Sequence, residues 1–178
     1  MKKKEKQLRV LGKELKTIND RIEFVRRELG YPVSSFARKL GGSKAAMINV
    51  LSSEKNEDPS LKTVKSMATV FPVSYDWLLV GIGNPYTTDD ITPWKFTDRV
   101  DESPLDEEVN SRLKMIRENL ELSQAMFADT LDVSRDVVSF METNRTALTV
   151  PVLKRLIKKH KINPFWILFG EGNYLSKK

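Results

Sequence analysis

Apolar side chains recur every three or four residues along two stretches of the chain, residues 20–83 and 111–174, and this spacing predicts short α-helices. In the second stretch, serines and prolines mark where helices should begin, because a serine hydroxyl caps a first turn and proline fits the first helical position. The expected starts are Ser111, Ser123, Ser134, Pro151 and Pro164. Asp132 tolerates the left-handed backbone of a tight turn, for which the other stretch has Gly41. The fold class expected from these patterns is all-α.

The two stretches also repeat one another. A shift of 91 residues, which becomes 89 after two extra residues in the first loop near 52–59, superposes apolar and turn-forming positions. The matched pairs include Leu29 with Leu120, Phe36 with Phe127, Ser43 with Ser134, Trp77 with Trp166, and Gly81 with Gly170. The expected organisation is a basic N-terminal helix or arm at 1–19, a first domain at 20–83, an acidic linker at 84–110, a second domain at 111–174 and a tail at 175–178.

Three motifs in the second stretch carry a family resemblance. They are Ser123-Gln124-x-x-Phe127-Ala128, Val133-Ser134-Arg135 and Glu142-x-Asn144-Arg145. In this order they resemble the Cro/cI-type helix-turn-helix family, also called lambda-repressor-like or XRE-type domains. Residues 163–170 and 73–81 look like the closing helix of such domains. The resemblance covers residues 20–83 and 110–173, and it implies two tandem five-helix domains that bind double-stranded DNA.

The resemblance also implies which side chains meet DNA. The third helix of such a domain enters the major groove, so Arg135, Asp136 and Phe140 are expected to face the bases. Arg135 can pair with guanine, Asp136 can accept from cytosine or orient Arg135, and Phe140 can touch a thymine methyl group or pack against a partner. The remaining residues that the resemblance places at the DNA are Gln124, Ser134, Ser139, Thr143, Asn144 and Arg145. Of these, Gln124 and residues 143–145 are expected at phosphates.

The first stretch is a weaker candidate for reading DNA. Its third helix would offer Ser43, Lys44 and Asn49, and asparagine can pair with adenine in a bidentate way. However, Val33 replaces the glutamine that should contact a phosphate, and Ala45 offers only a methyl group. We therefore expect the second domain to be the main reader.

A buried ion pair should also distinguish the two domains. In the resembled family, the positions of Arg117 and Glu142 commonly pair across the domain. Their counterparts in the first stretch are Arg26 and Leu51, which cannot form such a pair.

Seven apolar residues near the N-terminus follow the alternating three- and four-residue spacing of a coiled-coil seam. They are Leu8, Leu11, Leu15, Ile18, Ile22, Val25 and Leu29. The last three belong to the expected core of the first domain, so the first four are available to pack on that domain or on another chain. The alternative is a frayed basic arm that touches DNA phosphates.

Composition and charge limit the classes of function that the chain can have. The 178 residues carry a net charge of +6, and the acidic stretch 84–110, with two basic and eight acidic residues, separates two basic regions. Basic surfaces attract polyanions such as DNA. The chain has no cysteine and one histidine, His160, and it shows no phosphate-binding glycine loop, so no catalytic, metal or cofactor site is expected. With no apolar run near the length of a membrane span, we expect a cytoplasmic protein that is not an enzyme.

These observations favour a bacterial or phage transcription regulator, by family analogy a repressor. One helix reads only a few base pairs, so a specific site needs a second reading helix. That helix comes either from the partner in a homodimer on palindromic half-sites or from the other domain of the same chain. The weak first domain favours the homodimer. The alternative function is an antitoxin-like protein that also binds a protein partner, for which the Trp94-x-Phe96 pair in the linker is the only evident surface.

Overall fold

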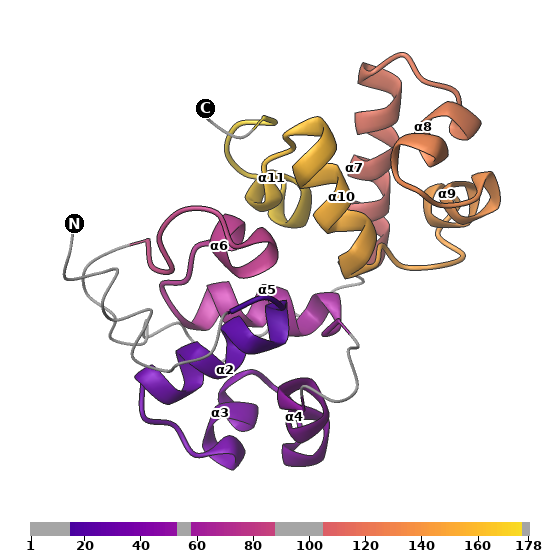
Figure 1. Cartoon of the computed structure of the whole chain (residues 1–178). Helices are drawn as coiled ribbons and strands as arrows, with labels where there is room; N and C mark the ends of the chain where they lie inside the picture. The colour runs from indigo at the N-terminus through magenta and orange to yellow at the C-terminus, as the bar shows by residue number, and fades with distance from the viewer. Residues whose placement is uncertain (1–14, 53–57, 88–104, 176–178) are drawn as a thin grey trace.

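The computed structural model describes residues 15–52, 58–87 and 105–175, which form ten α-helices and, within these ranges, no strand (Figure 1). The first half contains α2 (Ile18–Glu28), α3 (Val33–Lys39), α4 (Lys44–Leu51), α5 (Leu61–Val70) and α6 (Tyr75–Val80). The second half contains α7 (Leu105–Asn119), α8 (Gln124–Thr130), α9 (Arg135–Glu142), α10 (Val150–His160) and α11 (Pro164–Phe169). The all-α expectation is confirmed for the described ranges.

Helix α2 begins at a capping box, which interrupts the apolar seam expected along residues 8–29. The Thr17 backbone is extended, its hydroxyl accepts from the Asp20 backbone N–H at 3.0 Å, and the Asp20 carboxylate accepts from the Thr17 N–H at 3.0 Å. The chain is not helical at Thr17, so the coiled-coil spacing does not continue through one helix from Leu15 into α2. Leu15 packs half-buried against the core, whereas Leu8 and Leu11 lie outside the described residues. The later seam residues Ile18, Ile22 and Val25 are fully buried in the first half.

Helix α7 begins earlier than the sequence pattern suggested. It starts at Leu105, inside the segment expected to be a linker, and Ser111 lies within it rather than at its start. The Ser111 hydroxyl donates to the Glu107 carbonyl at 2.7 Å, so the expected cap at Ser111 is wrong. The cause is Val109, which is fully buried and extends the apolar stripe by one turn. Trp94 and Phe96 lie outside the described residues.

The other helix starts in the second half agree with their local chemistry. Ser123 and Ser134 each accept, through the side chain, the backbone N–H three residues further on, at 3.2 and 3.4 Å. Pro151 and Pro164 stand in the first turns of α10 and α11, where a missing N–H costs nothing. Asp132 has a φ of 50°, as expected of the tight turn between α8 and α9. The turn and four of the five expected starts are confirmed.

The last helix of each half ends in the same way. Gly81 and Gly170 adopt left-handed backbone, with φ values of 78° and 77°, and stop α6 and α11. The chain then turns back into an isolated antiparallel bridge. The bridges join Val73 to Tyr86 and Ile162 to Leu175.

An arginine, buried in the first half and half-buried in the second, ties the first helix of each half to the last. Nε of Arg21 donates to the Leu78 carbonyl at 2.8 Å, and Nε of Arg112 donates to the Ile167 carbonyl at 2.8 Å. Both guanidinium groups thus satisfy carbonyls at a helix end that have no partner within the helix. At Gly170 an added Cβ would lie 2.9 Å from Arg112 Nη1, so a side chain there would disturb this bond as well as strain the backbone.

One aromatic pair differs between the halves. Phe36 and Phe71 stack in the first half, with ring centroids 5.4 Å apart. In the second half, Phe127 faces His160 at 5.8 Å, and the histidine Nε2 lies 2.8 Å from the Thr130 hydroxyl. His160 is the last residue of α10. Burial, with a smaller contribution from the charge of Lys159, lowers the pKa of His160.

Replacing His160 with phenylalanine, the residue at the matching position 71, should reduce the acid sensitivity of the fold. Because the pKa of His160 is lower in the folded protein than its unfolded value of about 6.5, the unfolded chain binds the proton more readily, and stability falls as the pH drops through that value. Urea unfolding at about pH 7.5 and 5.5 should show a smaller decrease in the free energy of unfolding for His160→Phe than for the wild type. Equal decreases would contradict this assignment.

Candidate DNA-binding interface

The α8–turn–α9 unit presents one face of α9 to solvent. Val138 and Met141 are buried beneath the helix, which anchors it to the core. Along the opposite side, Arg135, Asp136 and Phe140 are exposed. The structure thus brings the three residues expected to face bases together on the outside of one short, firmly packed helix.

The other expected contact residues flank this helix. Ser134 is exposed at its N-terminus and caps it, and Ser139 is half-buried. Thr143, Asn144 and Arg145 are exposed just beyond its C-terminus, while Gln124 is half-buried at the start of α8. These positions follow the rim of the α9 face.

Phe140 and Arg145 form a cation–π pair. The ring of Phe140 is 40% exposed, and the guanidinium carbon of Arg145 lies 5.7 Å from its centroid. The Arg145 backbone N–H also donates to the Phe140 carbonyl at 2.8 Å, which turns the chain back toward the helix. Such a cation–π contact holds the arginine charge close to α9.

Arg117 and Glu142 form the buried ion pair that the sequence predicted. Arg117 Nε lies 2.6 Å from Glu142 Oε1 and Nη2 lies 3.1 Å from Oε2, a bidentate contact between α7 and the end of α9. The side chains are 14% and 3% exposed. Hydrogen bonding to the carboxylate raises the pKa of Arg117. The pair locks α9 to α7.

Gln124 joins this pair. Its side-chain amide donates to Glu142 Oε2 at 2.9 Å, so one of its donors is already used inside the protein. The sequence indicated only a phosphate contact for Gln124, and that role stays a prediction. The structure adds a second role, because the amide connects the start of α8 to the end of α9.

Asn110 was missed by the sequence reasoning, which placed it in the linker. It is fully buried, and its amide nitrogen donates to Asn144 Oδ1 at 3.1 Å and to the Thr146 carbonyl at 2.9 Å. Its oxygen accepts from the Leu148 backbone N–H at 3.1 Å. Asn110 therefore fixes the loop after α9, including Asn144, whose φ of 56° is left-handed. The available signal was the 91-residue shift, which pairs Asn110 with Asn19.

The matching surface of the first half has different chemistry. Ser43 caps α4 by accepting from the Ala46 backbone N–H at 3.1 Å, and Lys44 and Asn49 are exposed. Ala45, Ala46 and Ile48 are exposed as well, with Ile48 at 48%, so the outer side of α4 is largely apolar.

Arg26, the counterpart of Arg117, pairs with Glu23 on its own helix at 2.7 Å. Leu51 stands half-buried where the second half has Glu142. The ion pair between the first and third helices does not form here, as the difference in sequence predicted, and Arg26 pairs within α2 instead.

Comparison with family models agrees with this geometry for the second half. Residues 113–167 match the family described as "Helix-turn-helix", which supports one XRE-type helix-turn-helix domain in this part of the chain. Comparison with curated proteins found no match, and neither did comparison with solved structures. None of the described helices is long and apolar enough to cross a membrane.

Proposed function

We propose that the protein is a sequence-specific, double-stranded DNA-binding repressor in which α9 is the main reading helix. The observation that carries this proposal is the exposed face of Arg135, Asp136 and Phe140 on a helix locked in place by Arg117 and Glu142. A major groove is wide enough for a helix, and each base pair displays its own pattern of donors and acceptors there. A rigid helix can read that pattern because its side chains start from fixed positions.

Each exposed group has a role in this proposal. Arg135 donates to guanine, and Asp136 accepts from cytosine or orients Arg135. Phe140 either touches a thymine methyl group or only supports Arg145, which contacts a phosphate. The loop held by Asn110 places Asn144 beside Arg145, so both can meet the DNA backbone together. Bound to a promoter, such a domain represses by excluding other proteins from the same stretch of DNA.

We also propose that the first half is a second, diverged copy of the domain. The support comes from contacts that recur at matched positions. Arg21 and Arg112 bond equivalent carbonyls, and the two isolated bridges join equivalent pairs. Ser43 and Ser134 cap equivalent helices. The copy has kept these fold-determining contacts but not the buried ion pair or the polar outer face of the third helix.

Binding to DNA fragments at several salt concentrations tests the function. The protein should select fragments from a genomic pool, and its affinity should fall steeply with salt, because bound phosphates release counterions. Arg145→Ala should weaken binding similarly on all sequences and lower the slope of log affinity against log salt by about one. Lys158→Ala removes an exposed charge from the last turn of α10 and should leave the slope unchanged. Failure to bind any duplex, with the fold intact, would contradict the proposal and favour a protein-binding role.

A further inference from the structure

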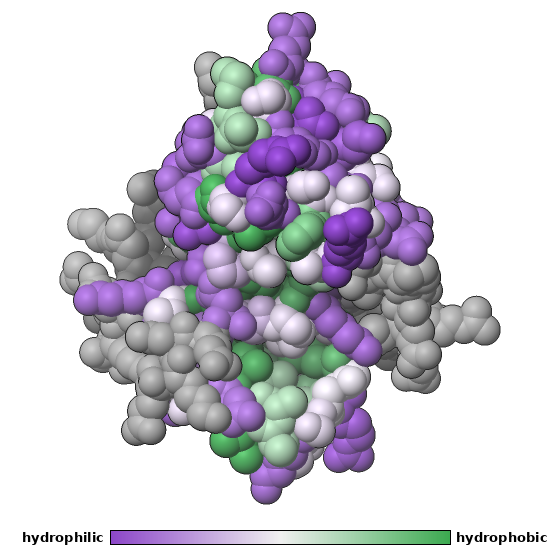
Figure 2. Space-filling model, turned by 90° about the vertical axis from the view of Figure 1, so that its right-hand side faces the viewer, coloured by the Kyte–Doolittle hydropathy of each residue, from purple (hydrophilic) through white to green (hydrophobic). Residues whose placement is uncertain are grey.

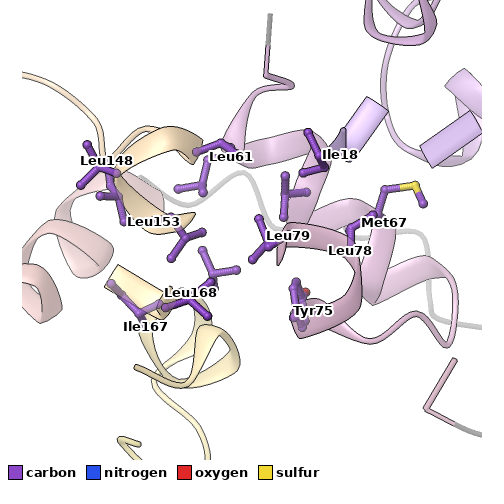
Figure 3. Packing of buried hydrophobic residues seen from close by; sticks show 14 of the residues in the cluster. Ile18, Leu61, Met67, Tyr75, Leu78, Leu79, Leu148, Leu153, Ile167 and Leu168 are labelled. Atoms are coloured by element: carbon purple, nitrogen blue, oxygen red, sulfur yellow. The ribbon is translucent and has the colours of Figure 1, made fainter. Parts of the chain in front are cut away.

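The two halves meet through their last helices. Helix α6 packs against both α10 and α11 (Figure 3). At the centre, the buried ring of Tyr75 lies 5.9 Å from Phe165 and 5.7 Å from Phe169 between ring centroids. The buried apolar residues of both halves form one continuous cluster. The contact between the halves therefore resembles the core of a single domain rather than a small contact between two independent domains.

Two lysines at matching positions cross this contact. Lys65 of α5 places its ammonium 4.6 Å from the ring centroid of Phe169 in α11. Lys154 of α10, which the 89-residue shift pairs with Lys65, lies 3.0 Å from an Asp58 oxygen just before α5. The same helices of each half thus face each other. A homodimer interface is likewise built from the same helices of both subunits, and here the two sides come from the two halves of one chain.

The third helices lie away from this contact, in the outer part of each half. In Figure 1, α9 lies at the upper right of the molecule, and α4 lies at the bottom, near its centre. Figure 2 views the right-hand side of the molecule and shows mostly hydrophilic surface in its upper part and hydrophobic surface toward its lower end. Nothing described in the structure stands between either helix and solvent along its exposed face.

We propose that the contact of α5 and α6 with α10 and α11 acts within one chain as a dimer interface, so that a single chain binds one duplex through both α9 and α4. This inference rests on the proposed DNA-binding function and replaces the homodimer expected from the sequence. The preferred site then has two unlike half-sites, one read by each third helix, at a fixed distance and on the same face of the DNA.

The chemistry of α4 specifies its half-site. The exposed methyl and alkyl groups of Ala45 and Ile48 fit thymine methyl groups in the major groove. The exposed amide of Asn49 suits adenine, and Lys44 at the helix start suits a phosphate. The half-site bound by α4 is therefore rich in A·T pairs, and the half-site bound by α9 contains the guanine contacted by Arg135.

Helical phasing tests this arrangement. The site is first taken from fragments that the full-length protein selects, and both half-sites are mapped by footprinting. Inserting about 5 base pairs between the half-sites turns one of them to the opposite face of the duplex and should lower the wild-type affinity about tenfold. Inserting about 10 base pairs returns both half-sites to the same face of the duplex but increases the distance between them. This insertion should also lower the affinity, because the contact between the halves cannot stretch. Mass measurement of the complex should give one chain per duplex.

Weakening the contact should reduce the sensitivity to spacing. Lys154→Asp places a second carboxylate beside that of Asp58. The repulsion between them should loosen the contact between the two halves and reduce the loss of affinity caused by the 5-base-pair insertion. Lys154→Asp/Asp58→Lys restores opposite charges and should restore this loss of affinity. Lys158→Asp makes the same change of charge one turn later on α10 and should behave like the wild type. Thermal unfolding of each variant establishes that it is folded under the binding conditions.

Several outcomes would overturn the inference. Two chains on a palindromic footprint would restore the homodimer, and affinity unchanged by the insertion would show that α9 alone reads the site. Both results leave the DNA-binding proposal intact, because duplex binding itself is observed in each. No binding to any duplex would instead overturn the proposed function.

Discussion

Replacing Glu142 with leucine, the residue at the matching position 51, should lower the free energy of unfolding by about 3 kcal/mol, because it leaves the Arg117 guanidinium in a largely buried site without its carboxylate. Arg117 Nη1 would still donate to the Leu122 carbonyl, at 3.0 Å in the wild type, and Nη2 would keep only the more distant and exposed Glu118 carboxylate, at 3.5 Å, while Nε would lose its acceptor. The side-chain amide of Gln124 would also lose its hydrogen-bond acceptor, Glu142 Oε2. Urea unfolding measured by circular dichroism gives this free energy directly.

The double variant Arg117→Met/Glu142→Leu is the matched control. An apolar pair of similar volume often replaces a buried ion pair at little cost, so the double variant should be clearly more stable than Glu142→Leu alone. A loss from Glu142→Leu that the double variant does not recover would mean that Glu142 acts mainly through Gln124. A single variant as stable as the wild type would contradict the energetic role assigned to the pair.

The local signals of the sequence determined much of the fold. Helix starts at Ser123 and Ser134, the turn at Asp132 and the stop at Gly170 follow from chemistry within a few residues, and the structure confirms them. Cap hydrogen bonds and left-handed turns depend on the nearest neighbours along the chain, and for that reason a sequence reveals them. The start of α7 was missed because Val109 looked like part of an acidic linker until its burial was known.

Contacts between distant segments were predictable only where a family pattern existed. The pair of Arg117 and Glu142 came from such a pattern, and the structure confirms it. No pattern links Asn110 to residues 144–148, and none links Tyr75 to Phe165 and Phe169. These contacts depend on how helices pack in three dimensions, which hydrophobic spacing along one helix does not specify. The individual DNA contacts remain predictions, because the geometry of a free surface is compatible with more than one partner base.

The largest effect on DNA binding is expected at Arg135. Arg135→Ala should weaken binding to the selected site by about 1–3 kcal/mol, which is roughly 5- to 150-fold, because a bidentate contact with guanine is lost. The preference for that base pair should relax, so that wild-type and base-substituted sites bind the variant with nearly equal affinity. Arg135 is exposed at the start of α9, so the fold should not suffer. Competition binding against sites substituted one base pair at a time measures both quantities.

Lys44→Ala/Asn49→Ala on α4 is the comparison that separates the two helices. Because α4 offers fewer polar contacts than α9, the double variant should lose less affinity than Arg135→Ala, and hydroxyl-radical footprints should show protection lost from one half-site only. Arg135→Ala should instead change the base preference of the other half-site and leave the α4 half-site unchanged. A double variant that loses more affinity than Arg135→Ala would reverse the order of the helices and make α4 the main reader. Arg135→Ala binding with unchanged affinity and unchanged base preference would exclude the start of α9 from base recognition.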